Sequence, residues 1–223
     1  MINWTQIKTI LLDMDGTLLD LNFDNYFWQT HVPTRYAEKH GLDLEAAKQI
    51  LFPRFREIEG TMDWYCVDHW TRELGMDIEL LKQEVEHLIA VHPHVIDFLI
   101  AAQSADKRLV LVTNAHGKSL RLKMKRTKLG KHFDEIICAH DFGIPKENVK
   151  FWDKLQTREP FEKGATLLVD DSLAVLRSAK QYGIEHLLAV HKPDSRQSSR
   201  NVKEFAAINH FSDLMPIHHP IDT

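Results

Sequence analysis

Two cysteines are too few for a disulfide framework in this chain of 223 residues. Because Cys66 and Cys138 both lie in apolar surroundings, we expect two buried thiols and a reducing, cytoplasmic compartment. No apolar run approaches the length of a membrane span, and the first residues lack the basic and apolar regions of a secretion signal. The net charge of -4 provides no general attraction to nucleic acid or acidic membranes. The sequence thus favours a soluble protein whose partners are neither nucleic acid polymers nor membranes.

A glycine-rich phosphate loop is also missing, so ATP or NAD dependence has no support. The 14 histidines show no zinc-like spacing with cysteines or acids. The chain does have 43% hydrophobic and 27% charged residues. This composition is enough to bury a sizeable core in one domain that carries a substantial insertion.

Two carboxylates follow an unbroken apolar run near the N-terminus. Residues 9–12 are predicted to form a parallel strand buried on both faces, which places Asp13 at its carboxyl end. Gly16 then allows a sharp turn. Asp13 and Asp15 repel each other unless a cation or a shared proton lies between them. An acid before Gly-Thr is also ordinary turn chemistry, so this pair alone leaves a solvated turn and a functional site both open.

Strands and helices alternate from residue 92 onward. The predicted strands are 108–112, 135–138, 165–169 and 184–190, and the predicted helices are 94–105, 117–129, 148–155 and 173–182. A further short helix is expected near residues 201–207. The alternation predicts an α/β fold with a doubly wound parallel sheet and right-handed crossovers.

Residues 21–91 show helical patterns and no convincing strand. Pro53 is expected to divide one of these helices. The aromatic side chains are expected to form the core of this segment rather than a ligand cage, namely Phe23, Phe27, Trp28, Trp64, Tyr65 and Trp70. We therefore predict an α/β core domain built from residues 1–20 and 92–223, with an all-helical domain, residues 21–91, inserted after the first strand.

Polar residues recur where later predicted strands end or open into loops. They are Thr113 and Asn114, Lys146, and Asp170 with Asp171. Each group alone is common turn or capping chemistry. At successive strand ends of one parallel sheet, the groups together indicate a single site.

This set of residues suits phosphoryl transfer. Asp13 is an oxyanion that can attack phosphorus to form an aspartyl-phosphate, and Asp15 can protonate the leaving oxygen and then deprotonate water. The oxygen ligands of the set suit Mg²⁺, namely Asp13, the Asp15 backbone carbonyl, Asp170 and Asp171. Lys146 and Thr113, with Asn114 beside it, would offset the charge on the phosphoryl oxygens.

The segments Asp13-Met14-Asp15-Gly16-Thr17, Thr113-Asn114, Lys146 and Val169-Asp170-Asp171-Ser172 resemble the four motifs of the haloacid-dehalogenase-like (HAD) hydrolase superfamily. The resemblance implies a HAD-like, Rossmannoid core in which residues 21–91 form a small helical cap that closes over substrate. It implies Asp13 as nucleophile, Asp15 as acid/base, Thr113 and Lys146 as phosphate ligands, and Asp170 with Asp171 at the metal. Asp171 is favoured as the direct ligand. The acid at Asp15 implies phosphate chemistry rather than carbon–halogen cleavage.

A narrower likeness covers about residues 8 to 214. The stretch from Leu11 to Trp28, and Trp64-Tyr65-Cys66 with Asp68 and Trp70, are similar to the bacterial GMP/IMP nucleotidase branch of the superfamily. This implies a 5′-nucleotidase for purine nucleoside monophosphates. Substrate specificity is then expected from the helical segment and the loop after Asp15, namely Asn22, Asp24, Asn25, Tyr26 and Trp64.

Two alternatives stay open. A sugar-phosphate phosphatase or phosphomutase of the same superfamily uses identical core residues. A non-catalytic receiver module also has a phosphoacceptor aspartate, Mg²⁺, Thr and Lys, but it has no helical insertion and its phosphoacceptor lies two strands after its acidic pair. One basic run is interpreted as a solvated helix face, namely Lys118, Arg121, Lys123, Lys125, Arg126 and Lys128. The oligomeric state stays open.

Overall fold

The sheet at the centre of the molecule has six strands in the order β3-β2-β1-β4-β5-β6. The computed structural model of the protein describes residues 2–217. The strands are β1 Thr9–Leu12, β2 Arg108–Thr113, β3 Glu135–Cys138, β4 Thr166–Val169, β5 His186–Val190 and β6 Ala206–Ile208. Each neighbouring pair is parallel, so β1 lies between β2 and β4 with its carboxyl end at the same sheet edge as theirs. The predicted doubly wound parallel sheet is confirmed.

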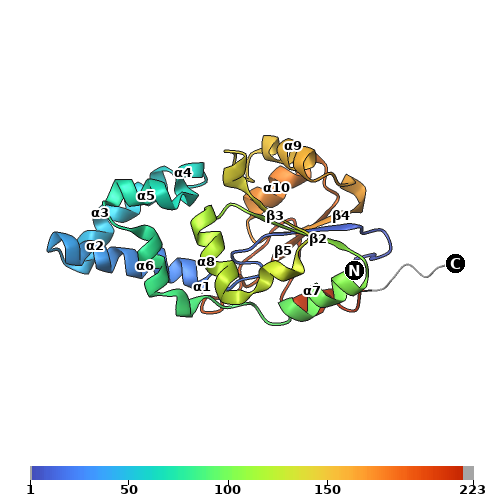
Figure 1. Ribbon diagram of the computed structural model, residues 1–223, viewed down its shortest axis with the longest axis horizontal. Helices are drawn as coiled ribbons and strands as arrows, with labels where there is room; N and C mark the ends of the chain where they lie inside the picture. Colours follow the sequence, from blue (N-terminus) through green and yellow to red (C-terminus); the bar gives the residue numbers. More distant parts are fainter. Residues whose placement is uncertain (1, 218–223) are drawn as a thin grey trace.

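Helices cover both faces of this sheet (Figure 1). The helices of the sheet body are α7 Val95–Ser104, α8 Gly117–Thr127, α9 Val149–Arg158 and α10 Leu173–Tyr182. In Figure 1, α9 and α10 lie above the sheet and α7 lies below it. Because side chains of a strand alternate between faces, Leu11 packs in the cluster that contains Phe151, whereas Ile10 packs in the cluster that contains Phe98. All four residues of β1 are buried, as expected for a central strand.

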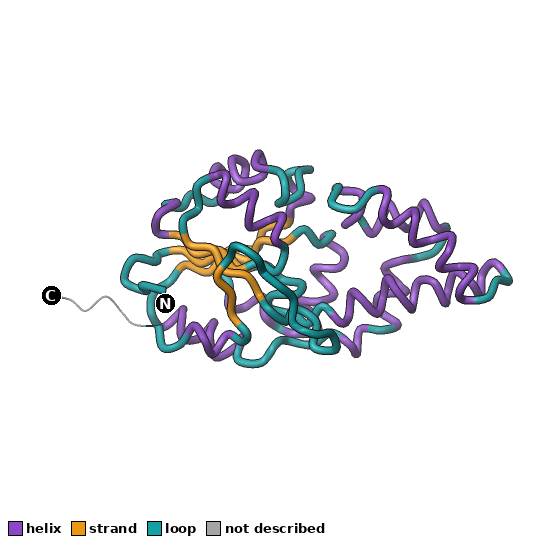
Figure 2. Tube along the Cα trace, turned by 180° about the vertical axis from the view of Figure 1, so that it is seen from behind, coloured by secondary structure: helices purple, strands orange, loops and turns teal. Residues whose placement is uncertain are grey.

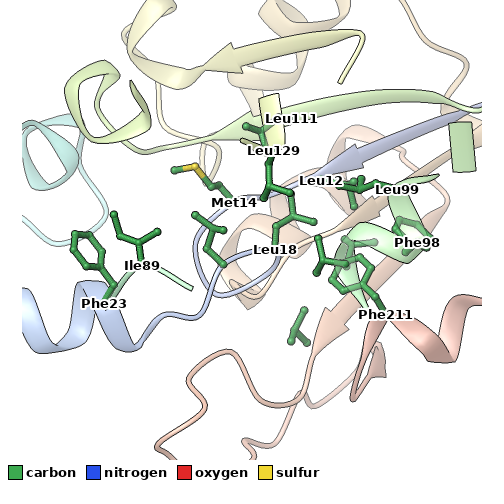
Figure 3. Close-up of a cluster of buried hydrophobic side chains, with 14 of the residues drawn as sticks. Leu12, Met14, Leu18, Phe23, Ile89, Phe98, Leu99, Leu111, Leu129 and Phe211 are labelled. Atoms are coloured by element: carbon green, nitrogen blue, oxygen red, sulfur yellow. The ribbon is translucent and has the colours of Figure 1, made fainter. Parts of the chain in front are cut away.

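The core below the sheet continues toward the inserted segment. Figure 3 shows Leu12 and Leu111 of the strands with Phe98 and Phe211, and Leu18, Phe23 and Ile89 on the side of the inserted segment. These side chains belong to one buried cluster. The inserted segment therefore shares apolar packing with the sheet body.

Residues 21–91 form a helical lobe that projects from one end of the sheet body (Figures 1 and 2). Its elements are α1 Asn22–Tyr26, the π-helix η1 Phe27–His31, α2 Val32–His40, α3 Leu44–Glu57, α4 Met62–Tyr65, α5 Val67–Leu74, α6 Ile78–Glu84 and the 3₁₀-helix η2 Glu86–Leu88. The two connections to the body run antiparallel, because Asp20 N donates to Ala90 O at 2.9 Å and His92 N donates to Leu18 O at 2.9 Å. The chain thus enters and leaves the lobe through two adjacent segments joined by an isolated β-bridge.

Two local predictions are wrong. Pro53 lies inside the continuous helix α3, where the carbonyl of Gln49 loses its helical hydrogen-bond partner. Both residues are exposed, so water can reach this part of the helix. The helix expected near residues 201–207 is replaced by turns and by β6, which pairs with β5. Lys203 has a φ of 54°, which interrupts a helix, and the edge of β5 offers hydrogen bonds that a sequence pattern does not reveal. Within residues 2–217, no helix is long and apolar enough to span a membrane.

Candidate active site

The loop after β1 holds the two predicted catalytic acids at the carboxyl end of the sheet. Asp13 N donates to Val169 O of the neighbouring strand at 3.0 Å, and Gly16 N donates to Leu19 O at 2.7 Å to close the turn. Gly16 has a φ of 86°, and a Cβ at this position would lie 2.6 Å from Asp171 Oδ2. Only glycine allows the loop to approach Asp171 this closely.

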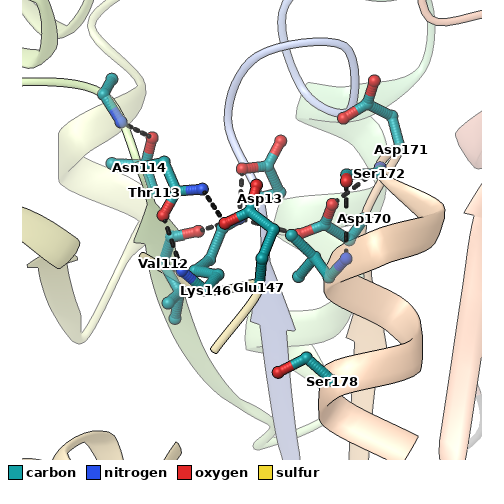
Figure 4. Close-up of polar contacts among 12 residues, drawn as sticks. Asp13, Val112, Thr113, Asn114, Lys146, Glu147, Asp170, Asp171, Ser172 and Ser178 are labelled. Atoms are coloured by element: carbon teal, nitrogen blue, oxygen red, sulfur yellow. Dashed lines mark hydrogen bonds and ion pairs between the residues drawn. The ribbon is translucent and has the colours of Figure 1, made fainter. Parts of the chain in front are cut away.

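Lys146 is a buried cation that links two of the predicted motifs (Figure 4). Its Nζ donates to Asp13 Oδ1 at 2.5 Å, to Asp170 Oδ2 at 2.7 Å and to Val112 O at 2.9 Å. Burial alone would lower the pKa of Lys146, but the two carboxylates raise it, so this side chain is an ammonium. The positive charge of Lys146 therefore offsets the negative charges of Asp13 in the first motif and of Asp170 in the fourth.

The side chain of Asn114 holds the loop that carries Lys146. Its Oδ1 accepts from Lys146 N at 2.9 Å, and its Nδ2 donates to Glu147 Oε2 at 2.9 Å. Tyr65 of the helical lobe donates from its hydroxyl to Glu147 Oε1 at 2.6 Å. Thr113 Oγ1 accepts from Ala115 N at 3.0 Å, which leaves the hydroxyl hydrogen of this residue for another acceptor.

Three carboxylates converge beside Lys146. Asp13, Asp170 and Asp171 each offer an oxygen, and these oxygens lie within 4.8 Å of one another. Burial raises the pKa of Asp13 and of Asp170 to about 6, and burial together with the charge of Asp13 raises that of Asp171 to about 7. Such a cluster of oxygen donors, held against its own repulsion, fits a hard divalent cation such as Mg²⁺.

The two acids of the fourth motif differ in their protein partners. Asp170 accepts from Ser172 N at 2.9 Å with Oδ1 and from Lys146 with Oδ2, so both of its oxygens have protein donors. Asp171 accepts from Arg200 Nη2 at 2.7 Å with Oδ2. Of the two, Asp171 therefore has the less occupied carboxylate.

A second ion network surrounds Asp15. Lys123 Nζ lies 2.7 Å from Asp15 Oδ1 and 2.6 Å from Asp24 Oδ2, and Lys82 Nζ lies 3.1 Å from Asp24 Oδ1. Burial raises the pKa of Asp15 to about 6, against the charge of Lys123. Burial alone would also raise the pKa of Asp24, but its two lysines lower it to about 2. Asp24 is therefore ionised at neutral pH, whereas Asp15 can take up a proton.

A cavity of about 780 Å³ lies between the sheet body and the helical lobe. The predicted motif residues that line it are Asp13, Asp15, Thr113, Asn114, Lys146, Asp170 and Asp171. Of the predicted specificity residues, Asp24, Asn25 and Trp64 line the cavity, and Asn22 and Tyr26 do not. Tyr26 is 37% exposed and its ring stacks on His31 instead. The structure thus brings the predicted catalytic, phosphate-binding and metal-binding residues to one cavity.

The interpretation of the basic run as a solvated face is wrong at Lys123, whereas Lys118 stays partly exposed. Lys123 is only 1% exposed because it pairs with Asp15 and Asp24. Lys118 pairs with Asp68 at 2.9 Å and with Glu79 at 3.1 Å, both from the lobe. Their spacing along α8 carries no signal that separates them from the exposed lysines, since their partners come from distant segments.

Two further expectations need correction. Trp28, Trp64 and Tyr65 line the cavity, whereas Phe23 and Trp70 are buried as predicted, so the aromatic side chains of the lobe are only partly its core. Cys138 is buried, but Cys66 is only half-buried, because it lies between two short helices at the boundary with the body.

Sequence reasoning missed several residues of the site. Lys82, Glu147 and Arg200 all line the cavity and pair with predicted residues. Glu147 directly follows Lys146, and this adjacency is the one signal that marks it in the sequence. Arg200 lies in the polar tail, where no pattern distinguishes it.

A model of the haloacid dehalogenase-like hydrolase family matches residues 10–189. The chain belongs to this family. The chain is also similar to two curated relatives. The GMP/IMP nucleotidases YrfG of Escherichia coli (strain K12) and of Shigella flexneri are each 37% identical to this chain over 215 residues. Each match covers 96% of this chain and 97% of the relative.

Solved structures agree with the fold of this HAD hydrolase. A HAD phosphatase from Thermococcus onnurineus superposes with a TM-score of 0.78 at 24% identity, covering 93% of this chain and 96% of that one. A Thermotoga maritima protein assigned as a β-phosphoglucomutase superposes with a TM-score of 0.66 at 18% identity, covering 93% of this chain and 97% of that one. These structures show that the fold extends over nearly the whole chain.

Proposed function

We propose that this HAD hydrolase is a Mg²⁺-dependent phosphomonoesterase that acts through an aspartyl-phosphate on Asp13. The observation that carries the proposal is the contact of one buried ammonium, Lys146 Nζ, with both Asp13 and Asp170 in a cavity large enough for a nucleotide. A cation in this place stabilises the charge that develops on a transferring phosphoryl group. The family and the nucleotidase relatives support the same chemistry.

In the first step, a carboxylate oxygen of Asp13 attacks phosphorus, and the bond from phosphorus to the ester oxygen breaks. Asp15 gives its proton to the departing oxygen, so the leaving group departs as an alcohol. The pKa of Asp15, raised to about 6 by burial, supports this role because the carboxyl can hold a proton close to neutral pH. The charge of Lys146 stabilises the phosphoryl oxygens, and the hydroxyl of Thr113 donates to one of them.

In the second step, water attacks phosphorus and Asp15 removes a proton from it. The bond between phosphorus and Asp13 breaks, inorganic phosphate leaves, and the Asp13 carboxylate is restored. Asn114 contributes by position, because both ends of its side-chain amide bond to the loop that carries Lys146.

Mg²⁺ would be held by Asp13 and Asp171 with the backbone carbonyl of Asp15, and Asp170 would lie beside it. When bound, it supplies a Lewis acid that polarises the phosphoryl oxygens and neutralises charge. Within residues 2–217, Asp171 Oδ1 accepts no hydrogen bond, which supports the choice of this residue as the direct ligand, with Asp170 holding Lys146.

The helical lobe, residues 21–91, is proposed to work as a cap over the site. It is joined to the core, residues 1–20 and 92–223, through one pair of connections, and it contributes Tyr65 and Trp64 to the cavity wall. A lobe attached in this way can open for exchange and close to exclude water.

The proposed substrate class is the purine nucleoside 5′-monophosphates GMP and IMP. The relatives that carry this name are similar over nearly their whole length, which supports the choice. The cavity offers the indole rings of Trp28 and Trp64 for stacking against a base. Arg56, which also lines it, is a donor suited to O6 and N7, the acceptors that guanine and hypoxanthine share.

A substrate comparison tests the proposal. The kcat/KM values for GMP, IMP, AMP and a hexose 6-phosphate are measured with Mg²⁺ and after chelation. We expect GMP and IMP to exceed AMP and the sugar phosphate, and chelation to abolish turnover. Preference for the sugar phosphate would contradict the substrate class. A single stoichiometric phosphorylation without turnover would contradict the reaction and indicate a receiver-like function.

A further inference from the structure

A cluster of one cysteine and two histidines lies where the helical lobe meets the sheet body. Cys66 comes from the lobe, between α4 and α5, while His116 precedes α8 and His140 follows β3 in the body. Each of the three side chains offers one ligand atom, and these atoms lie within 4.8 Å of one another. Three segments distant in sequence therefore bring one sulfur and two nitrogen donors together.

A second observation indicates that this cluster lacks a ligand. His140 Nε2 is buried and has no hydrogen-bond partner among residues 2–217. A buried polar atom left in this way costs about 1–3 kcal/mol, so a native structure rarely keeps one without a reason. The rings of His116 and His140 are 4.9 Å apart between centroids and nearly perpendicular, at 89°. Within residues 2–217, His140 Nε2 does not bond to the ring of His116.

The donor set is different from that of the candidate active site. Asp13, Asp170 and Asp171 provide hard oxygen ligands, which suit Mg²⁺. A thiolate and two imidazoles are the ligands of zinc and of other borderline transition metals, and three protein ligands leave a fourth position for water.

We propose that Cys66, His116 and His140 form a second metal site, for a thiophilic divalent ion such as Zn²⁺, that ties the helical lobe to the sheet body. The ion would take one ligand from the lobe and two from the body, so it binds only when the two are together. The site is next to the active site, because His116 lines the cavity and Tyr65, the neighbour of Cys66, bonds to Glu147. Occupancy of the site would thus hold the lobe in place over the cavity.

Cobalt spectroscopy on the full chain tests the site. Co²⁺ is added in the presence of excess Mg²⁺, which saturates oxygen sites, and absorption is followed in the near ultraviolet and the visible. We expect one Co²⁺ per chain, with a charge-transfer band from the Cys66 thiolate and the intense visible bands of a tetrahedral ion. Absence of the thiolate band in the wild-type chain would overturn the proposal.

Variants from each side of the boundary test the bridge. Cys66→Ser in the lobe and His140→Gln in the body are each expected to remove the thiolate band or weaken Co²⁺ binding at least about 100-fold. Cys138→Ala is the matched control, because Cys138 donates to Ala115 O at 3.1 Å and is not part of the cluster. A thiolate band that forms in either site variant at the same Co²⁺ concentration as in the wild-type chain would contradict the assignment, and so would loss of the band in a control that stays folded.

A measurement on the unmodified chain keeps the test independent of folding. Zn²⁺ is expected to raise the melting temperature of the wild-type chain and to protect Cys66 from alkylation, mapped by mass spectrometry. Alkylation of Cys66 at the same rate with and without Zn²⁺ would rule the site out, whatever the behaviour of the variants.

Discussion

Lys123 Nζ lies 2.7 Å from Asp15 Oδ1, so a fully buried ammonium from the middle of α8 contacts the proposed acid/base. The charge of Lys123 lowers the pKa of Asp15 against the effect of burial. Lys123 does not reach the reacting atoms in the proposed mechanism, and it acts as a positioning residue for Asp15.

The variant Lys123→Met should slow hydrolysis of the aspartyl-phosphate by about 10²-fold, within the range for lost acid/base catalysis. Without the ammonium, the pKa of Asp15 rises, and less of the carboxylate is available to deprotonate water. Formation of the intermediate needs the protonated form, so phosphoenzyme should accumulate. Rapid-quench experiments with labelled substrate measure the amount of phosphoenzyme. Lys125→Met, on an exposed position of the same helix, is the control. Slower turnover without accumulation would argue against this role of Lys123.

The variant Asp13→Asn should reduce turnover by at least about 10³-fold, since the nucleophile is lost. Burial raises the pKa of Asp13 to about 6, which means that its charge is unfavourable in the folded state near neutral pH. The melting temperature without metal should therefore stay the same or rise. Steady-state kinetics and thermal melts measure the two effects, with exposed Asp153→Asn as control. Activity close to that of the control would remove Asp13 from the proposed mechanism.

The variant Lys146→Met should destabilise the fold by roughly 3–5 kcal/mol, because removing one partner leaves buried carboxylates uncompensated. Asp13 and Asp170 both lose the ammonium that bonds to them. A divalent cation can replace part of that charge, so Mg²⁺ should raise the melting temperature of this variant more than that of the wild-type chain. Exposed Lys150→Met should behave like wild type. Equal Mg²⁺ effects on the variant and the wild-type chain would contradict the shared site.

The variant Asp24→Asn should cost roughly 3–5 kcal/mol at pH 7, because Lys123 and Lys82 stay buried without their common partner. The pKa of Asp24 is lowered from 3.8 to about 2 in the folded state. Its contribution is therefore fully present above about pH 4 and is lost as the pH falls toward 2. Denaturant unfolding of both chains between pH 7 and pH 3 measures the difference. If the difference in free energy of unfolding between the two chains grew as the pH fell, the prediction would be contradicted.

The variant Arg56→Gln should lower kcat/KM for GMP and IMP by about 10-fold, with little effect on AMP, as expected for loss of one base contact. Arg56 lines the cavity from α3. Arg54 lies on the same helix and pairs with Glu73 at 3.0 Å, so Arg54→Gln is the matched control. Equal losses for all three nucleotides would assign Arg56 to the phosphate or the ribose instead of the base.

The chain itself determined the strands β1 to β5, their parallel arrangement and the residues at their ends. An apolar run such as Ile10-Leu11-Leu12 has to be buried on both faces, and this requirement places Asp13 at the edge of the sheet whatever the rest of the molecule does. Gly16 and Lys146 carry local signals of the same kind. The glycine indicates a turn and the lysine indicates a polar loop position, each directly from its residue type.

Tertiary structure alone decided the partners of the buried charges and of the soft donors. Lys123 and the exposed Lys125 lie on one helix. They differ because, in the part of the chain that the structure describes, carboxylates from other segments contact Lys123 and not Lys125. Cys66, His116 and His140 come together in the same way, through the docking of the lobe on the body. Local periodicity reports the face on which a residue lies, but the energy of an ion pair or a metal site depends on groups that are distant in sequence, and only the folded chain brings these together.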